Sequence, residues 1–217
     1  MPKKASTFVS LTDVTSLKVV YKGNAWMGAI ELIGGTTCVV NPVMGLQEVL
    51  TGELPVSHVL APNHYHNKAL TAFSEYFNSA QLCSSDAARP RLEKITGLIT
   101  EPLIHLSSHL PKGMTLIEPE GLKPGEVWLR FLVGDKVGWM VIDAFCGSKM
   151  TASKQFCEDP ELLKTFPTYG IADRDRYKMW VLEQIKQDQP VLIIPCHGSI
   201  IRDSALASKL EALIATL

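Results

Sequence analysis

The sequence lacks the cysteine patterns that cross-link or metallate small proteins. Its five cysteines are an odd number, they are widely spaced, and no two of them form a CxxC pair. This argues against both a disulfide framework and a zinc knuckle. We therefore expect reduced thiols at Cys38, Cys83, Cys146, Cys157 and Cys196.

Signals for export and for membrane insertion are also missing. The amino terminus, Met-Pro-Lys-Lys-Ala-Ser, has no apolar core of a secretory signal. No run in the chain approaches the ~20 apolar residues that span a bilayer. A cytoplasmic location is the expectation.

Neither sign of charge is in excess, since 21 basic residues stand against 22 acidic ones and the net charge is -1. Such a chain has no electrostatic funnel toward nucleic acid or anionic lipid. The phosphate-binding motifs GxxxxGK(S/T) and GxGxxG are absent. We expect a small-molecule substrate or ligand, no nucleic acid and no membrane, and we leave open a homodimer.

The composition is that of an ordinary globular protein, with 217 residues, 46% hydrophobic and 20% charged. No internal repeat, low-complexity tract or long Pro-, Gly- or Ser-rich linker divides the chain. A single domain over residues 1–217 is expected.

The first third of the chain predicts a meander of short strands. β-branched runs separated by Asn, Gly and Asp turns indicate strands at 7–11, 16–23, 25–35, 36–43 and 56–62. After the last of these the hydrophobic period changes to that of a helix. Leu70, Phe73 and Phe77 share one face, with Asn67 as the predicted N-cap.

The rest of the chain alternates strands and helices, which predicts α/β layering. The strongest pattern is a hairpin formed by 127–133 and 137–145 around Gly134-Asp135-Lys136. The other expected elements are a strand in QLCSS, a helix ending at Gly97, a helix with Tyr177, Trp180, Val181 and Ile185 on one face, a strand in PVLIIP, and a closing helix with Leu206, Leu210, Leu213 and Leu217.

Candidate metal ligands stand where predicted strands end. His64 and His66 follow the strand VSHVLAP, Asp143 falls late in VGWMVIDAF, and His197 follows PVLIIPC. In an extended segment, residues two apart project to the same side, so both imidazoles of the HxH pair could reach one ion. Because sites gather at the carboxyl ends of strands in layered α/β folds, these four residues could converge.

The order and spacing of these segments resemble the metallo-β-lactamase fold superfamily of metallohydrolases. VSHVLAPNHYHNKAL is similar to its strand followed by HxHxDH, WMVIDAFCG to its strand with the metal-bridging Asp, and IIPCHG to its last histidine loop. The resemblance implies a four-layer αβ/βα sandwich with the site at one edge, between two sheets.

Several positions depart from the family pattern. Asn67 and Lys68 stand where the family has Asp and His, and Asn41 stands where an earlier strand ends in Asp. The family's third histidine corresponds to Leu122, and an apolar side chain cannot coordinate a metal. The resemblance therefore implies a reduced, mononuclear site for one zinc or iron ion, held by His64, His66, Asp143 and His197.

The departures also suggest substitutes for the missing groups. Glu126 is the ionisable residue nearest to Leu122, where the family's third histidine is missing. It is therefore a candidate base or metal ligand, and Asp143 and Glu126 are the two candidate catalytic residues. The alternative for Glu126 is an exposed loop carboxylate. The Lys68 ammonium is a candidate mimic of the second cation, paired with Asp143. Its alternative is a solvated lysine in the first helical turn.

Other pairs of reactive side chains carry weaker patterns. Cys196 adjoins His197, but neighbours in a chain point apart, and a buried thiol packs as a small hydrophobe. His105 and His109 are four apart, yet Pro102 and Pro111 confine any helix between them. His58 is expected to be a core residue.

The functional expectation is a metal-dependent hydrolase of a small ester, lactone, thioester or phosphoester. The alternative is a non-catalytic relative of this fold whose cleft binds a ligand or partner without metal. A third interpretation is redox chemistry at one iron ion. Fold alone does not choose among them, because functions differ within one fold.

Overall fold

A computed structural model describes residues 7–50, 55–123, 125–151 and 155–217 of the chain. The amino-terminal segment used above to argue against a secretory signal, and Pro124 in the stretch around Leu122, lie outside these residues. No helix in the described ranges is long and apolar enough to cross a membrane.

The first half of the chain forms a seven-stranded sheet whose strands neighbour one another in chain order. The strands are β1 Val9–Ser10, β2 Leu17–Lys22, β3 Ala25–Leu32, β4 Thr36–Val40, β5 Val56–Leu60, β6 Gln81–Ser84 and β7 Glu101–Pro102. β1 to β4 pair antiparallel, as the predicted meander requires, and β4 to β7 pair parallel. The carboxyl ends of β4 and β5 therefore lie side by side.

The second half forms a six-stranded sheet in the order β11-β13-β12-β10-β9-β8. Its strands are β8 Thr115–Ile117, β9 Trp128–Val133, β10 Lys136–Met140, β11 Phe156–Cys157, β12 Leu192–Ile194 and β13 Ile200–Arg202. The predicted hairpin is confirmed as β9 and β10, whose turn uses Gly134 at a φ of +62°. β10 pairs parallel with β12, so these two carboxyl ends also meet.

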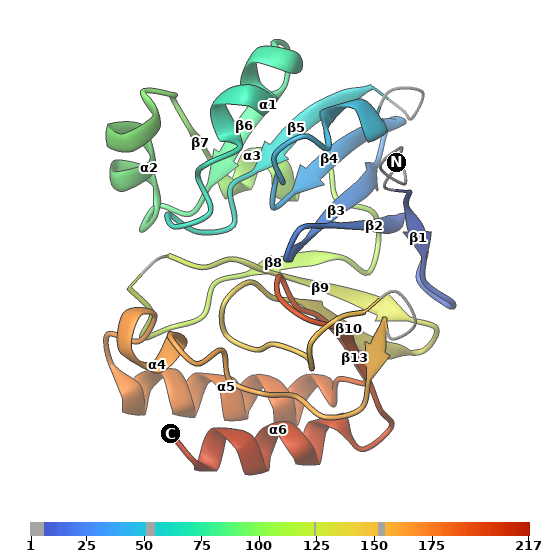
Figure 1. Cartoon of the computed structure of the whole chain (residues 1–217), viewed down its shortest axis with the longest axis vertical. Helices are drawn as coiled ribbons and strands as arrows, with labels where there is room; N and C mark the ends of the chain where they lie inside the picture. Colours follow the sequence, from blue (N-terminus) through green and yellow to red (C-terminus); the bar gives the residue numbers. More distant parts are fainter. Residues whose placement is uncertain (1–6, 51–54, 124, 152–154) are drawn as a thin grey trace.

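The helices cover the outer faces of the two sheets (Figure 1). α1 Leu70–Tyr76 and α2 Arg89–Thr96 pack on the first sheet, while α5 Arg174–Asp188 and α6 Leu206–Ala215 pack on the second. The shorter helices are η1 Gln47–Leu50, α3 Leu103–Ser107 and α4 Phe166–Tyr169. A third hydrophobic cluster, with Trp26, Leu60 and Phe131, fills the space between the sheets. The expected αβ/βα sandwich is confirmed.

Local signals in the sequence account for several helix ends. α2 has proline in its first turn and ends at Gly97, whose φ of 71° is the left-handed conformation favoured at this position. Asp173 is the N-cap of α5, and its side chain accepts the Arg176 N–H. The N-cap predicted for α1 was wrong. α1 begins after Ala69, and Asn67 Nδ2 instead donates to the His64 carbonyl at 2.7 Å.

The predicted strand 137–145 is shorter than expected, because β10 ends at Met140. The backbone N–H groups of Ile142 and Asp143 donate to the Glu126 carboxylate at 3.1 and 3.2 Å rather than to a strand. A side chain therefore turns the chain out of the sheet just before Asp143. This turn places Asp143 at the edge between the two sheets.

Candidate functional site

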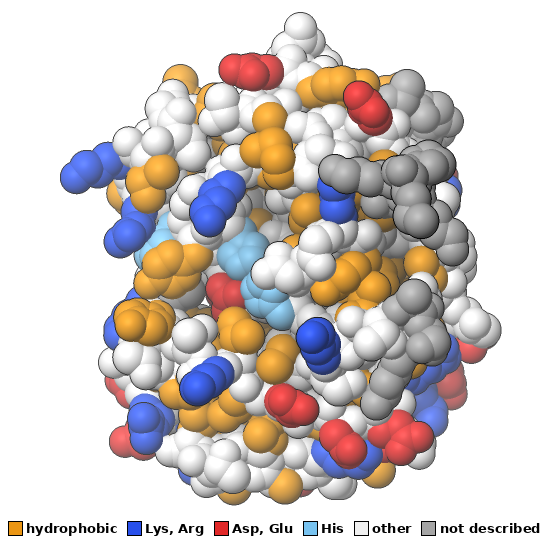
Figure 2. Space-filling view, in the orientation of Figure 1, with side chains coloured by type: hydrophobic (Ala, Val, Ile, Leu, Met, Phe, Trp, Pro, Cys, Tyr) orange, Lys and Arg blue, Asp and Glu red, His pale blue; other side chains and the backbone are white. Residues whose placement is uncertain are grey.

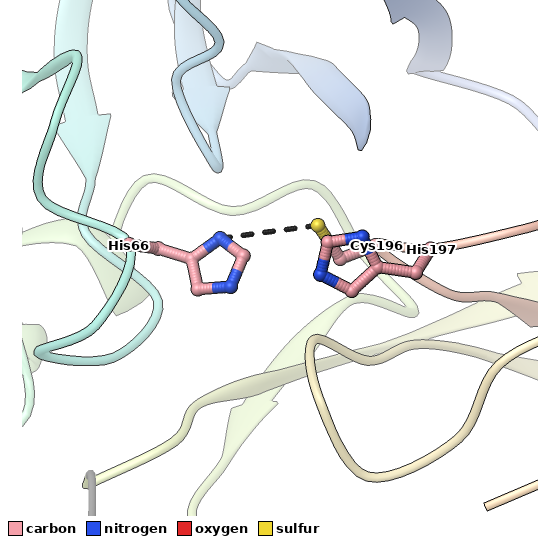
Figure 3. Close-up of side chains that lie close together, drawn as sticks. All are labelled: His66, Cys196 and His197. Carbon is pink, nitrogen blue, oxygen red and sulfur yellow. Dashed lines mark hydrogen bonds between the residues drawn. The ribbon is translucent and has the colours of Figure 1, made fainter. Parts of the chain in front are cut away.

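The candidate site lies where four strand ends from both sheets meet. Asn41 follows β4, the segment from Asn63 to His66 follows β5, Asp143 follows β10, and Cys196 with His197 follows β12. Figure 3 shows His66 approaching Cys196 and His197 from the opposite side. Since β4 and β5 run parallel, as do β10 and β12, the topology alone brings these ends together.

Asp143 is the point at which the side chains converge. Its Oδ1 lies 3.2 Å from His66 Nε2 and 3.6 Å from His197 Nε2. Its Oδ2 accepts a hydrogen bond from Asn63 Nδ2 at 3.0 Å. Burial alone would raise the pKa of Asp143, but hydrogen bonds from His197, His66 and Asn63 hold it well below its usual range. The carboxylate is therefore ionised at neutral pH.

Asn41 orients the His66 ring. Its Nδ2 donates to the Trp26 carbonyl at 2.7 Å and to Cys196 Sγ at 3.2 Å, which leaves Oδ1 to accept from His66 Nδ1 at 2.9 Å. The backbone of Asn41 has a φ of 55°, a left-handed conformation that Asn tolerates better than most residues. With a proton fixed on Nδ1, His66 presents Nε2 to Asp143.

A backbone carbonyl orients the other imidazole. His197 Nδ1 donates to the Asn24 carbonyl at 2.9 Å, so its Nε2 faces Asp143 as well. The next residue, Gly198, has a φ of 82°, and a Cβ there would lie 2.2 Å from the Gly147 carbonyl oxygen. Only glycine fits this close approach of two loops. The loop geometry therefore aims His197 into the site.

Both imidazoles favour the protonated form when no cation lies between them. Burial opposes protonation of His66, but hydrogen bonds to Asp143 and Cys196 raise its pKa to about 10. Hydrogen bonds to Asp143 and Cys196 likewise raise the pKa of His197 to about 11. The carboxylate thus gathers two positive charges, which a single bound metal ion could replace.

Cys196 lies at the back of the site and is fully buried. Its Sγ lies 3.8 Å from His66 Nδ1, the contact drawn dashed in Figure 3. Burial raises the pKa of this thiol, but hydrogen bonds from His197 and His66 outweigh it and lower the pKa to about 7. Among the described residues, His66, Cys196 and His197 form a group whose ligand atoms lie within 4.8 Å of one another.

These residues fit one metal ion. Two ligands held at about 2.0–2.1 Å in a tetrahedron lie roughly 3.4 Å apart, which is close to the separations of Asp143 Oδ1 from the two Nε2 atoms. Both Nδ1 atoms donate to oxygen acceptors, as is usual for metal-bound histidines. The structure places His66 and His197 beside Asp143, and these are three of the four residues expected to converge.

The structure does not bring His64 into this group. His64 is buried and packs edge-on against Tyr65, with ring centroids 4.3 Å apart, and its Nε2 has no hydrogen-bond partner. The segment is not extended, because Asn63 Oδ1 accepts the backbone N–H groups of Tyr65 and His66. This turn separates two imidazoles that an extended chain would have aligned. Asn63, which the sequence reasoning missed, contacts Asp143 instead.

The other residues proposed as substitutes also lie elsewhere. Lys68 is exposed, and within the described ranges it forms no ion pair with Asp143, whose Oδ2 is occupied by the Asn63 amide. The cation-mimic hypothesis for Lys68 is therefore not retained. Leu122 packs beside the core of the second sheet and pairs with Ile171. Neither position therefore contributes a metal ligand.

Glu126 is buried beneath the site rather than exposed in a loop. Its carboxylate accepts a hydrogen bond from Trp128 Nε1 at 2.7 Å, in addition to those from the backbone N–H groups of Ile142 and Asp143. Burial and the nearby Asp143 charge raise the pKa of Glu126 to about 7, against the lowering effect of these donors. With 1% of its surface exposed, Glu126 positions Asp143 and does not reach substrate.

A pocket of about 380 Å³ opens over the metal-ligating side chains. Figure 2 shows the histidines and an acidic side chain together in a depression bordered by hydrophobic groups. The walls are mainly apolar and aromatic, and Tyr65 Oη donates to the Tyr169 carbonyl at 3.2 Å across the rim. The lining residues are Tyr65, His66, Asp143, Leu163, Thr165, Phe166, Tyr169, Gly170 and His197.

Sequence comparison identifies no relative, since no protein-family model and no curated protein matches the chain. Solved structures do match. The metal-soaked flavodiiron core of Flv1 from Synechocystis sp. PCC6803 aligns with a TM-score of 0.60 and 13% identity over 98% of this chain. The chain spans 62% of the length of that protein.

Two metallo-β-lactamases match over nearly their whole length. The enzyme from Pontibacter korlensis has a TM-score of 0.63 and 11% identity, covering 98% of this chain and 100% of its own. FIM-1 from Pseudomonas aeruginosa in its mono-zinc form has a TM-score of 0.63 and 12% identity, covering 97% and 95%. The chain has the metallo-β-lactamase superfamily fold.

Proposed function

We propose that this chain, a protein of metallo-β-lactamase fold, is a metal-dependent hydrolase that acts on a small ester, lactone, thioester or phosphoester. His66, His197 and Asp143 would hold one zinc or iron ion. The observation that carries the proposal is the direction of the two rings. Each Nδ1 donates to a fixed oxygen, and each Nε2 faces the same carboxylate oxygen of Asp143.

An ion bound there would lower the pKa of a bound water toward ~7 and polarise a carbonyl or phosphoryl oxygen. The chain's own residues provide binding and orientation. Asp143 is the only carboxylate among the residues that line the pocket, and its low pKa makes it a weak proton acceptor. The proposal therefore favours substrates whose leaving group is a stable anion, such as thioesters and aryl esters.

The pocket walls suggest where the non-reacting part of the substrate binds. Leu163, Phe166, Tyr65 and Tyr169 present apolar or aromatic surface beside the ligand cluster. A pocket of this size and character suits a small molecule with an apolar portion. The polar group to be cleaved would then face His66, His197 and Asp143.

Binding without metal is the second candidate, and one observation favours it. Asp143 is satisfied by the chain itself, because Asn63 donates to Oδ2 while both imidazoles face Oδ1. Such a site is electrostatically stable with no ion. The pocket would then bind a small ligand and catalyse nothing.

Elemental analysis of protein purified without added metal separates the two candidates. The hydrolase proposal predicts that His66→Ala holds one zinc or iron ion per chain fewer than the parent protein, whereas the matched control His64→Ala holds as many as the parent. The loaded protein should hydrolyse aryl ester or thioester substrates, and His66→Ala should not. Metal-free protein that gains neither an ion nor activity after incubation with zinc or iron would overturn the proposal. Equal metal loss in both variants would do the same.

A further inference from the structure

A second group of histidines lies outside the candidate site and includes one on β5. His58 is the middle residue of this strand, whereas the segment with His66 follows its carboxyl end. His109, just after α3, packs against His58 with ring centroids 5.1 Å apart. His105 on α3 lies one helical turn before His109. The candidate hydrolytic site uses none of these side chains.

The buried His58 ring has one ring nitrogen without a hydrogen-bond partner. Its side chain is 6% exposed, and its Nδ1 lies 2.9 Å from Ser57 Oγ. Its Nε2 is buried and has no hydrogen-bond partner. Buried polar atoms are nearly always paired, so an unpaired imidazole nitrogen calls for an explanation such as an ion.

His109 completes the same pattern from the other side. Its Nδ1 donates to the His105 carbonyl at 2.8 Å, which leaves the Nε2 lone pair available. Two imidazoles bound at about 2.0–2.1 Å to one tetrahedral ion have ring centroids roughly 5.2 Å apart. The observed 5.1 Å agrees with this spacing. The oxygen partners of both Nδ1 atoms match the usual arrangement around metal-bound histidines.

We infer that His58 and His109 form a second site for a divalent transition-metal ion such as Zn²⁺, with water in its remaining positions, since no third ligand atom of the described residues lies within 4.8 Å of both. The carboxylate of Glu101 lies 3.9 Å from His105 Nε2 and adds negative charge beside the site. An ion here links β5 to the turn after α3, whose His109 carbonyl also accepts the Ile33 N–H. This role is structural and does not depend on the proposed hydrolase activity.

The experiment removes the first site before it examines the second. The double variant His66→Asn/His197→Asn, stripped with a chelator, is titrated with Zn²⁺ and followed by calorimetry and by the histidine ring signals in NMR. We expect one zinc ion per chain, with the signals of His58 and His109 shifting together. Adding His109→Asn should weaken zinc binding at least tenfold, whereas adding His105→Asn should leave it unchanged.

The variants are chosen so that loss of folding does not imitate loss of the site. His109 and His105 are exposed, whereas replacing the buried His58 would disturb the packing of β5. Lys112→Ala, an exposed position three residues after His109, is the matched control and should bind zinc unchanged. A background that binds no zinc, or that binds it equally well with His109→Asn, would overturn the inference.

Discussion

Two carboxylates near the end of β10 lie in opposite environments. Asp143 borders the pocket and faces two imidazoles, and its pKa is held below the usual range. Glu126 lies beneath it among neutral N–H donors, and burial raises its pKa to about 7. The same chemical group thus has two roles, because the Asp143 carboxylate faces imidazolium groups whereas the Glu126 carboxylate faces neutral backbone and indole N–H groups. The first can hold an ion, and the second positions the first.

Removing the charge of Asp143 should have the largest effect on this comparison. Asp143→Asn removes the oxygen ligand and the negative charge that gathers His66 and His197, so zinc affinity should fall by at least about 100-fold. The pKa values of both histidines should also fall toward ordinary values. Calorimetry and NMR titration of the two rings measure these effects.

Asp135→Asn, at the exposed turn of the same hairpin, is the matched control and should change neither quantity. If Asp143→Asn kept its zinc affinity while the histidine pKa values fell, Asp143 would be an electrostatic partner rather than a ligand.

Neutralising Glu126 should mainly affect stability. Glu126→Gln replaces one acceptor oxygen with an N–H₂ that faces a backbone or indole donor, so the free energy of unfolding should fall by about 2 kcal/mol. Glu120→Gln, which removes an exposed ion pair with Arg176, should cost no more than about 0.5 kcal/mol. Urea unfolding at pH 7 makes this comparison.

The raised pKa of Glu126 also predicts a pH dependence. Because the folded state holds this proton more tightly than the unfolded chain, stability should decrease as pH rises from about 4.5 to about 7. Glu126→Gln should remove this part of the slope. An unchanged slope in the variant would show that Glu126 is ionised in the folded protein throughout this range.

The smallest effect is expected at the rim of the pocket. Tyr65→Phe removes only the exposed hydrogen bond from Tyr65 Oη to the Tyr169 carbonyl. The free energy of unfolding, measured by thermal unfolding, should change by less than about 0.5 kcal/mol, and zinc affinity should not change. A larger loss of metal affinity would mean that the rim, and not only Asp143, orders the ligand cluster.

Much of the fold could be predicted from the sequence because its elements have strong local patterns. Alternating hydrophobic residues indicated the β2–β4 meander and the β9–β10 hairpin, and Gly97 marked the end of α2. The end of β10 could not be predicted. The apolar run continues to Phe145, and only the distant Glu126 carboxylate takes the backbone N–H groups out of the sheet.

The site itself was only partly predictable. Asp143 and His197 followed from the rule that polar residues at strand ends collect at one edge, and the structure brings them together. The HxH pair misled, because Asn63 curls the backbone and separates His64 from His66. An Asn just after a strand, with free N–H groups two and three residues later, is the signal that could have indicated this turn.

Lys68 is a second case in which a motif position did not predict where a side chain lies. A missing cation suggested a positive side chain paired with Asp143, yet the Asn63 amide donates to Asp143 Oδ2 and Lys68 is exposed. The choice between an amide and an ammonium depends on which side chain the loop turns inward. No periodicity encodes that direction.

The sequence by itself determined the layers, the strand ends at which chemistry could gather, and the absence of the family's ligand types at Asn67, Lys68 and Leu122, because these follow from hydrophobic pattern and residue type. Only the tertiary structure decided which histidine joins Asp143, that Glu126 is buried, and that His58 meets His109. Those outcomes depend on hydrogen bonds and contacts between residues distant in the chain, which local pattern does not contain.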